Sequence, residues 1–153
     1  MEVDRSFIGA TMPPFVVEVE KGAIRQFARA IGETNPVYFD EAVARQQGYR
    51  SLPAPPTFVA SFRPVERQPW LAQLDSGRIL AGEQTFSNVR RLVAGDVVSC
   101  EMGLADIVEK KGRSGVMQLL VQEVQVTDGD GRLVVVNKRI VIYRAAGNLN
   151  STR

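Results

Sequence analysis

The second half of the chain contains four consecutive stretches with strand character, and this run constrains the fold more than any other feature. The stretches cover residues 78–89, 96–109, 116–127 and 133–143. They are rich in valine, isoleucine and leucine, often alternating with polar residues, as in strands that bury one face. Only residues 128–132, which begin Asp-Gly-Asp-Gly, separate the last two, and this short connection predicts a hairpin. We therefore expect a long antiparallel sheet.

The first half predicts one strand followed by short helices. Val17 and Val19 alternate with glutamates, which indicates a strand over residues 14–20. Apolar residues then follow the helical period, which predicts a helix over residues 23–31. Gly32 ends this helix, because glycine adopts the left-handed conformation without steric cost.

A second helix is expected over residues 41–47, between Asp40 as N-cap and Gly48 as the stop. The prolines of segment 52–56 require an extended chain.

Thr57 is placed to cap a further helix that begins at Phe58. Pro64 and Pro69 limit its length, so a kink or an early end is expected. The apolar side chains of this segment make it the core element that the sheet must cover. Segregated helices and strands of this kind indicate an α+β fold, with the sheet wrapped around one helix.

Length and charge favour a single globular domain over residues 1–153, with a frayed polar tail at about 146–153. The net charge of +2 gives no argument for nucleic-acid or membrane binding. No apolar run approaches the roughly 18 residues that a membrane span requires, and the N-terminus does not resemble a secretory signal. With a single cysteine, Cys100, these features predict a reducing, cytoplasmic location.

The sequence contains no histidine, and this excludes several kinds of chemistry. The usual general base at neutral pH is missing, as are Ser-His and Cys-His nucleophiles and imidazole metal sites. The aspartates of segment 128–131 lack the later oxygen ligands of a calcium loop, so they are interpreted as a hairpin turn. We expect no metal and no cofactor.

The segment Phe27–Tyr38 is similar to the signature of MaoC-like (R)-specific enoyl-thioester hydratases and 3-hydroxyacyl dehydratases. In that family a helix ends in glycine, followed by aspartate, one residue, Asn-Pro, one residue and histidine. Segment 52–58 resembles the family's entry into the central helix, particularly in the N-terminal-domain type. The resemblance covers nearly the whole chain and implies a single hot-dog fold, an antiparallel sheet wrapped around a central helix.

In that family the aspartate and the histidine hold the water that adds to an enoyl thioester, and backbone N–H groups polarise the thioester oxygen. Here Glu33 stands at the aspartate position and Tyr38 at the histidine position, while Asn35 and Pro36 match. The resemblance thus assigns Glu33 and Tyr38 to a degenerate catalytic dyad that we expect to be inactive. The further residues that it assigns to substrate binding are Asn35, Pro36, Pro56, Thr57, Phe58 and Arg90.

Two interpretations of the dyad positions remain open. In the first, Glu33 and Tyr38 are loop residues of a decayed site, with Tyr38 beside the acyl tunnel and Glu33 facing solvent or pairing with an arginine such as Arg29. In the second, they form a working pair, although a phenol is a poor base at neutral pH. Thr57 is expected either to cap its helix or to contribute to an oxyanion site.

The resemblance implies an acyl-thioester-binding, non-catalytic subunit of an (R)-3-hydroxyacyl-thioester dehydratase or enoyl hydratase in fatty-acid metabolism. Its ligand is then a thioester of coenzyme A or acyl carrier protein, and its partner a dyad-bearing hot-dog subunit. One alternative is a homodimeric module that binds an acyl group or another small ligand without hydratase activity. Another is a self-sufficient hydratase or thioesterase that uses Glu33. An unpaired edge strand favours a homodimer or a heterodimer.

Some other residues have simpler expected roles. Arg90 and Arg91 are either solvated strand-end residues or contacts for a carrier phosphate. Phe62 and Trp70 are expected in the core or at an interface, and Cys100 as a small buried apolar residue.

Overall fold

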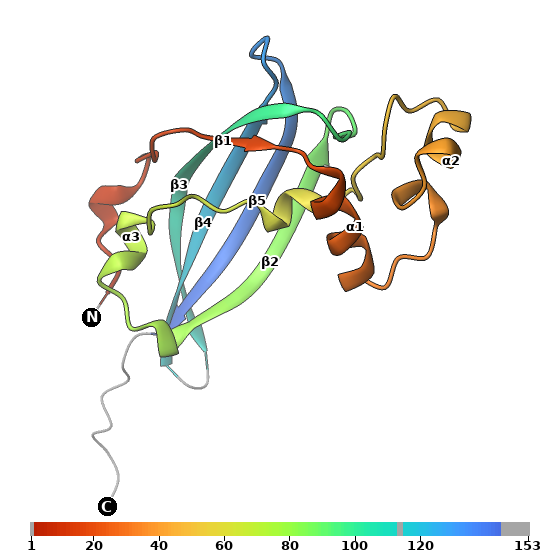
Figure 1. Ribbon diagram of the computed structural model, residues 1–153. Coiled ribbons are helices and arrows are strands. Elements are labelled where there is room, and N and C mark those ends of the chain that lie inside the picture. Colours follow the sequence, from red (N-terminus) through yellow and green to blue (C-terminus); the bar gives the residue numbers. More distant parts are fainter. Residues whose placement is uncertain (1, 113–114, 145–153) are drawn as a thin grey trace, which may run out of the picture.

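The computed structural model describes residues 2–112 and 115–144, and the tail predicted at 146–153 lies outside the described residues. A five-stranded antiparallel sheet in the order β1-β3-β4-β5-β2 dominates the fold (Figure 1). Its strands are β1 (Phe15–Glu18), β2 (Ile79–Asn88), β3 (Val97–Gly112), β4 (Gly115–Thr127) and β5 (Leu133–Arg144). All five strands predicted from the sequence are confirmed, and β3 continues three residues beyond its predicted end.

The predicted hairpin between β4 and β5 is also confirmed. The side chain of Asp128 accepts hydrogen bonds from the backbone N–H groups of Asp130 and Arg132. Gly131 has a φ of 75°, in the left-handed region that favours glycine. The aspartates therefore shape a turn, as the sequence predicts.

One face of the sheet forms the core. A row of register partners crosses it from Met102 through Val124 and Asn137 to Phe86. The first three side chains are buried, and Gln84 donates a hydrogen bond of 3.0 Å to Asn137. Because a buried amide needs a partner, this bond makes a polar residue tolerable in the core.

The two α-helices predicted in the first half are present as α1 (Lys21–Ala30) and α2 (Glu41–Gln46). Gly32 has a φ of 74°, and Glu33 N–H bonds to the carbonyl of Ala28, which closes α1 in a Schellman motif. The side chain of Asp40 accepts N–H groups of the first turn of α2, confirming the predicted N-cap.

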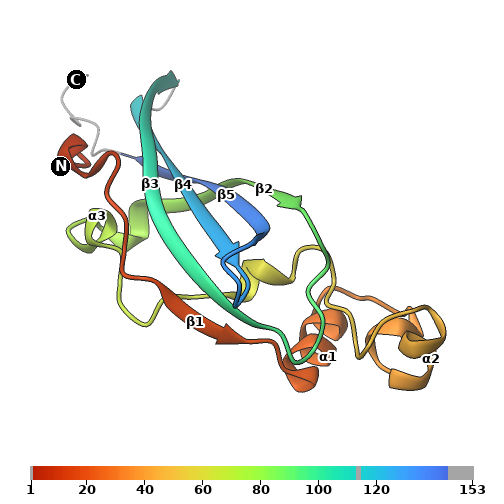
Figure 2. The ribbon, with the colours of Figure 1, turned by 90° about the horizontal axis from the view of Figure 1, so that it is seen from above.

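The segment that crosses the concave face is less helical than its sequence predicts. Phe58–Ser61 form a single 3-10 turn, η3, and the chain then runs on to the short helix α3 (Pro69–Ala72). Figure 2 shows the sheet curving around this segment. The prolines at 64 and 69 explain the early end, because proline removes a hydrogen-bond donor and clashes with the preceding turn.

The predicted cap at Thr57 is wrong. Its side chain makes no capping hydrogen bond, and the chain enters η3 through a preceding turn in which Phe58 N–H donates to Pro55 O. Phe62 and Trp70 are buried, as predicted. The remaining short 3-10 turns are η1 (Arg5–Phe7), η2 (Pro36–Tyr38) and η4 (Ser76–Arg78).

Among the described residues, no helix combines the length and apolar character needed to cross a bilayer.

Candidate functional site

The loop after α1 holds Glu33 in contact with its own backbone. The Oε1 atom of Glu33 accepts hydrogen bonds of 3.0 Å from the N–H groups of both Thr34 and Asn35. Asn35 Oδ1 in turn accepts the N–H of Val37 at 3.1 Å, at the start of η2. The Glu33 carboxylate therefore shapes the loop, and Asn35 braces it locally.

Arg29 does not pair with Glu33, although pairing was one of the two expected arrangements. Its guanidinium lies 5.7 Å from the centroid of the Phe39 ring, a cation–π geometry. No ion pair involving Glu33 occurs within residues 2–112 and 115–144. Glu33 is partly buried and keeps its contacts within the loop.

Tyr38, at the position of the family's histidine, is a core residue with one polar contact. Its side chain is 7% exposed, and its hydroxyl accepts a hydrogen bond of 3.1 Å from Nη1 of Arg91. Arg91 lies in the segment between β2 and β3, far from Tyr38 in sequence. The phenol therefore connects the loop after α1 to the end of β2.

A cavity of about 310 Å³ lies beside Arg91. Backbone pairing builds its walls, because Ala54 N–H donates to Leu92 O and Ala94 N–H to Leu52 O, each at 2.8 Å. Asn88, at the end of β2, donates a hydrogen bond of 3.3 Å to the carbonyl of Pro56. The lining residues are Ala54, Pro55, Pro56, Val59, Asn88, Val89, Arg90, Arg91 and Leu92.

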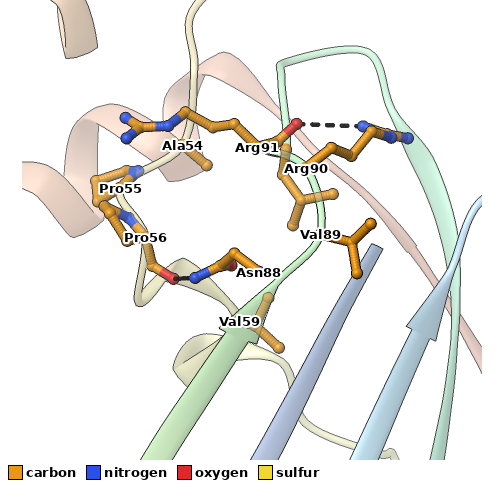
Figure 3. A pocket seen from close by; sticks show the side chains of 9 residues that line it. Ala54, Pro55, Pro56, Val59, Asn88, Val89, Arg90 and Arg91 are labelled. Carbon is orange, nitrogen blue, oxygen red and sulfur yellow. Dashed lines mark hydrogen bonds between the residues drawn. The ribbon is translucent and has the colours of Figure 1, made fainter. Parts of the chain in front are cut away.

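Arg90 and Arg91, which both line the cavity, point in different directions, and only Arg90 forms ion pairs among the described residues. Figure 3 shows Arg91 extending across the cavity toward Ala54 and Pro55, whereas Arg90 points away from it. The Arg90 guanidinium pairs with Asp96 at 2.8 Å and with Asp128 at 3.7 Å. The hydrogen bond to Asp96 raises the pKa of Arg90. The charge of Arg90 is thus neutralised within the fold.

Asp96 is the centre of this ionic cluster. Burial alone raises the pKa of its carboxyl, but the hydrogen bonds from Arg90 and from Val93 N–H, with the charges of Arg90 and Arg50, outweigh burial and lower it. The carboxylate also accepts the N–H of Val93, which closes the turn before β3. Asp96 therefore fixes both the turn and the direction of Arg90.

The other predicted binding residues are dispersed around this cavity. Asn35, Pro36 and Thr57 are exposed and do not line it, whereas Pro56 does. Phe58 is buried and lines a second cavity of about 320 Å³ against α1. Its ring packs edge-on against Phe27, with centroids 5.4 Å apart.

Titratable groups elsewhere offer little reactivity. Cys100 is fully buried, and burial raises the pKa of its thiol to about 12, so almost no thiolate forms at neutral pH. Within the described ranges, no three histidine, cysteine, aspartate or glutamate side chains gather as metal ligands. The cavity combines the Arg91 cation with walls of mixed polarity, an arrangement suited to binding an anionic ligand.

Residues 6–137 match the family described as FAS1-like, dehydratase domain region. The chain belongs to this family. A UPF0336 protein of Streptomyces griseus is 38% identical to this dehydratase-family chain, covering 95% of the chain and 98% of the relative. A UPF0336 protein of Thermobifida fusca is 35% identical, with coverages of 94% and 95%.

Solved structures confirm the hot-dog fold and the MaoC-like resemblance of this dehydratase domain. The C-terminally truncated HadBC complex of Mycobacterium tuberculosis, a 3R-hydroxyacyl-ACP dehydratase, aligns with a TM-score of 0.72 and 27% identity, covering 86% of this chain and 92% of that one. The ChsH1-ChsH2 complex of the same organism aligns with a TM-score of 0.72 and 23% identity, with coverages of 94% and 90%.

The sequence offered both Arg90 and Arg91 as contacts for a carrier phosphate and assigned only Arg90 to substrate binding, whereas in the structure Arg91 is the one that extends across the cavity (Figure 3). Neighbouring residues of an extended segment point in opposite directions, so only one of an Arg-Arg pair faces a given cavity. The spacing of Asp96 after the pair was a local sign that one arginine is neutralised. The contact with Tyr38 joins distant segments and has no sequence signal.

Proposed function

We propose that this chain is the acyl-thioester-binding, non-catalytic subunit of an (R)-3-hydroxyacyl-thioester dehydratase or enoyl hydratase. The observation that carries the proposal is the environment of Tyr38, a buried phenol that accepts a hydrogen bond from Arg91 beside a cavity. With Glu33 hydrogen-bonded to its own loop, the loop is a structural support for a binding site. The family match supports the dehydratase class.

The proposed partner is a hot-dog subunit that carries the complete Asp/His dyad. Strand β2 forms one edge of the sheet, with no neighbour on its outer side among the described residues. An unpaired strand edge offers backbone donors and acceptors to a second chain. The HadBC structure, described as a dehydratase complex, supports a heterodimer, and its assembly on this edge is part of the proposal.

Mixing the chain with a dyad-bearing partner tests the proposal. We expect a 1:1 complex by sedimentation and a gain in crotonyl-thioester hydration over the partner alone. A partner whose dyad histidine is replaced by alanine is the control, and its complex should remain inactive because this chain supplies no dyad. If no complex forms and no hydration is gained, the proposal fails.

A homodimeric binding module is the second candidate, because the same β2 edge can pair with a second copy. This candidate requires a stable homodimer that retains ligand without a partner. Sedimentation of the isolated chain as a monomer at all concentrations would exclude it. A homodimer that dissociates when the dyad-bearing partner is added would favour the heterodimer.

A further inference from the structure

Arg91 is the cation that the cavity leaves uncompensated. Within residues 2–112 and 115–144 it forms no ion pair, and its one side-chain hydrogen bond goes to Tyr38. Arg90, its neighbour, is paired with Asp96 and Asp128. A guanidinium carries five N–H donors, so most donors of Arg91 remain for a ligand.

Tyr38 fixes the position of this guanidinium. The phenol ring is anchored in the core, and a buried ring has little freedom to move. The Tyr38 hydroxyl accepts a hydrogen bond from Nη1 of Arg91 at 3.1 Å. Because the hydroxyl is uncharged, this bond orients the guanidinium without neutralising its positive charge. An arginine held in place loses less conformational entropy on binding than a free one.

The rest of the cavity lining is of mixed polarity, with slightly more polar than apolar surface. Prolines, alanine and aliphatic side chains line it together with Asn88 and Arg90, and Arg91 crosses it in Figure 3. Such a site suits an anionic group carried on a partly polar chain, because Arg91 supplies a cation beside both polar and apolar surface. Phosphate and carboxylate both match the planar donors of arginine.

We propose that Arg91, positioned by Tyr38, binds the phosphate of the carrier arm of an acyl thioester. The inference rests on the proposed function and deepens it, since it names the part of the ligand that this subunit recognises. Tyr38, at the position of the family's catalytic histidine, acts as a positioning residue for the anion-binding arginine. The same guanidinium could also bind the carboxylate of a free fatty acid. The test below distinguishes a phosphate ligand from a carboxylate ligand.

The test measures calorimetric binding of three probes to the isolated full-length chain. Decanoyl-coenzyme A carries phosphates, decanoyl-pantetheine carries none, and decanoate carries only a carboxylate. We expect Arg91→Gln to weaken decanoyl-coenzyme A binding about tenfold and to leave decanoyl-pantetheine binding unchanged. Arg132→Gln, which removes an exposed arginine of the β4–β5 turn, is the matched control and should bind all probes normally.

Tyr38→Phe removes only the hydroxyl and tests positioning. We expect a loss of about threefold for decanoyl-coenzyme A, because Arg91 keeps its charge but loses its fixed hydrogen bond. The double variant Tyr38→Phe with Arg91→Gln should bind no more weakly than Arg91→Gln alone. Such non-additivity shows that Tyr38 acts through Arg91, whereas additive losses would contradict a positioning role.

The outcomes separate the two proposals. If the unaltered chain binds none of the thioesters, the proposed function fails and this inference fails with it. If the chain binds decanoyl-coenzyme A and Arg91→Gln binds it equally well, this inference alone is wrong. Equal losses for coenzyme A and pantetheine thioesters would also overturn it, and a loss confined to decanoate would assign Arg91 to a free carboxylate.

Discussion

At the scale of single residues, Glu33 and Tyr38 each make a structural contact in the loop after α1. Glu33 accepts two backbone N–H groups, and Tyr38 accepts a guanidinium donor. Both side chains are thus engaged within the fold. A carboxylate that must hold a loop closed is poorly placed to move a proton on a ligand.

Replacing Glu33 separates its structural role from a chemical one. Glu33→Gln keeps an oxygen that can accept the two N–H groups, so stimulation of the partner's hydration should be unchanged. Glu33→Ala removes both hydrogen bonds and should lower the free energy of unfolding by about 1 kcal/mol. Urea denaturation measures the free energy of unfolding of Glu33→Ala. The hydration assay with the partner present measures the activity obtained with Glu33→Gln. Loss of hydration in Glu33→Gln would instead support the self-sufficient enzyme.

Asp96 is expected to make a pH-dependent contribution to stability. Since its pKa is lowered in the folded state, the contribution is complete above the ordinary value of 3.8 and is lost as the pH falls through the lowered value. Asp96→Asn should cost about 2 kcal/mol at pH 7, because it breaks charged hydrogen bonds. The difference from the unaltered chain should shrink below pH 4, measured by urea denaturation.

Asp130→Asn is the control for this experiment. Asp130 forms an exposed ion pair with Arg132, with 72% and 77% of their side chains accessible. Exposed pairs contribute about 0–1 kcal/mol, so little change is expected at either pH. If Asp130→Asn cost as much stability as Asp96→Asn, the special role of Asp96 at the centre of its ionic cluster would be contradicted.

At the scale of elements, alternation and turn residues were sufficient to predict all five strands and the helices α1 and α2, but not the short helix α3. The segment after Thr57 was harder, because an apolar helical pattern and two nearby prolines act in opposite directions. In the structure the prolines limit the helix, and the segment forms only the single 3-10 turn η3. Local signals of this kind decide where an element exists more reliably than how long it is.

The candidate site was only partly predictable for a different reason. Asn35 and Glu33 make contacts within a few residues, so a local motif identifies their loop. The contact between Tyr38 and Arg91 depends on how the end of β2 meets η2, which no local pattern records. Arg90 is neutralised mainly by Asp96, six residues further along the chain, and only its second partner, Asp128, comes from the distant hairpin.

The register between β2 and β5 shifts between Ala81 and Gln84, and this bulge gives a prediction about the strand. A Cβ atom at Gly82 would lie 2.8 Å from the carbonyl oxygen of Ile140, a backbone atom that has little room to move. Gly82→Ala should therefore destabilise the fold by about 2 kcal/mol and disturb the β2–β5 pairing. Gly22→Ala, in α1 with no atom within 4 Å, should stabilise it by about 0.5 kcal/mol. Thermal or urea unfolding measures the stability of both variants. An unchanged stability of Gly82→Ala would show that the bulge can shift to make room for the added methyl group.

At the scale of the whole molecule, the two edges of the sheet are different. Strand β1 is short, with four residues, whereas β2 has ten, and both carry an exposed apolar side chain, Val16 in β1 and Leu80 in β2. The longer edge offers more backbone groups for pairing with a partner. The cavity lies at the end of β2, so a partner on this edge would lie close to it.

Hydrogen exchange can identify the edge that the partner covers. We expect amides of β2, residues 79–88, to exchange more slowly in the complex than in the isolated chain. Amides of β1, residues 15–18, should exchange equally in both, which makes them the internal control. Protection of β1 without β2 would place the partner on the opposite edge and contradict the proposed assembly.

The strand order also has a consequence for how the chain reaches its native state. Strands β3, β4 and β5 follow one another in sequence and pair as neighbours, so they can form early at small entropic cost. Strand β2 joins β5 only after a long intervening segment has been closed into a loop. The edge proposed to meet the partner is thus completed late during synthesis. We expect co-expression with that partner to raise the folded yield, because pairing removes an exposed edge before chains can aggregate.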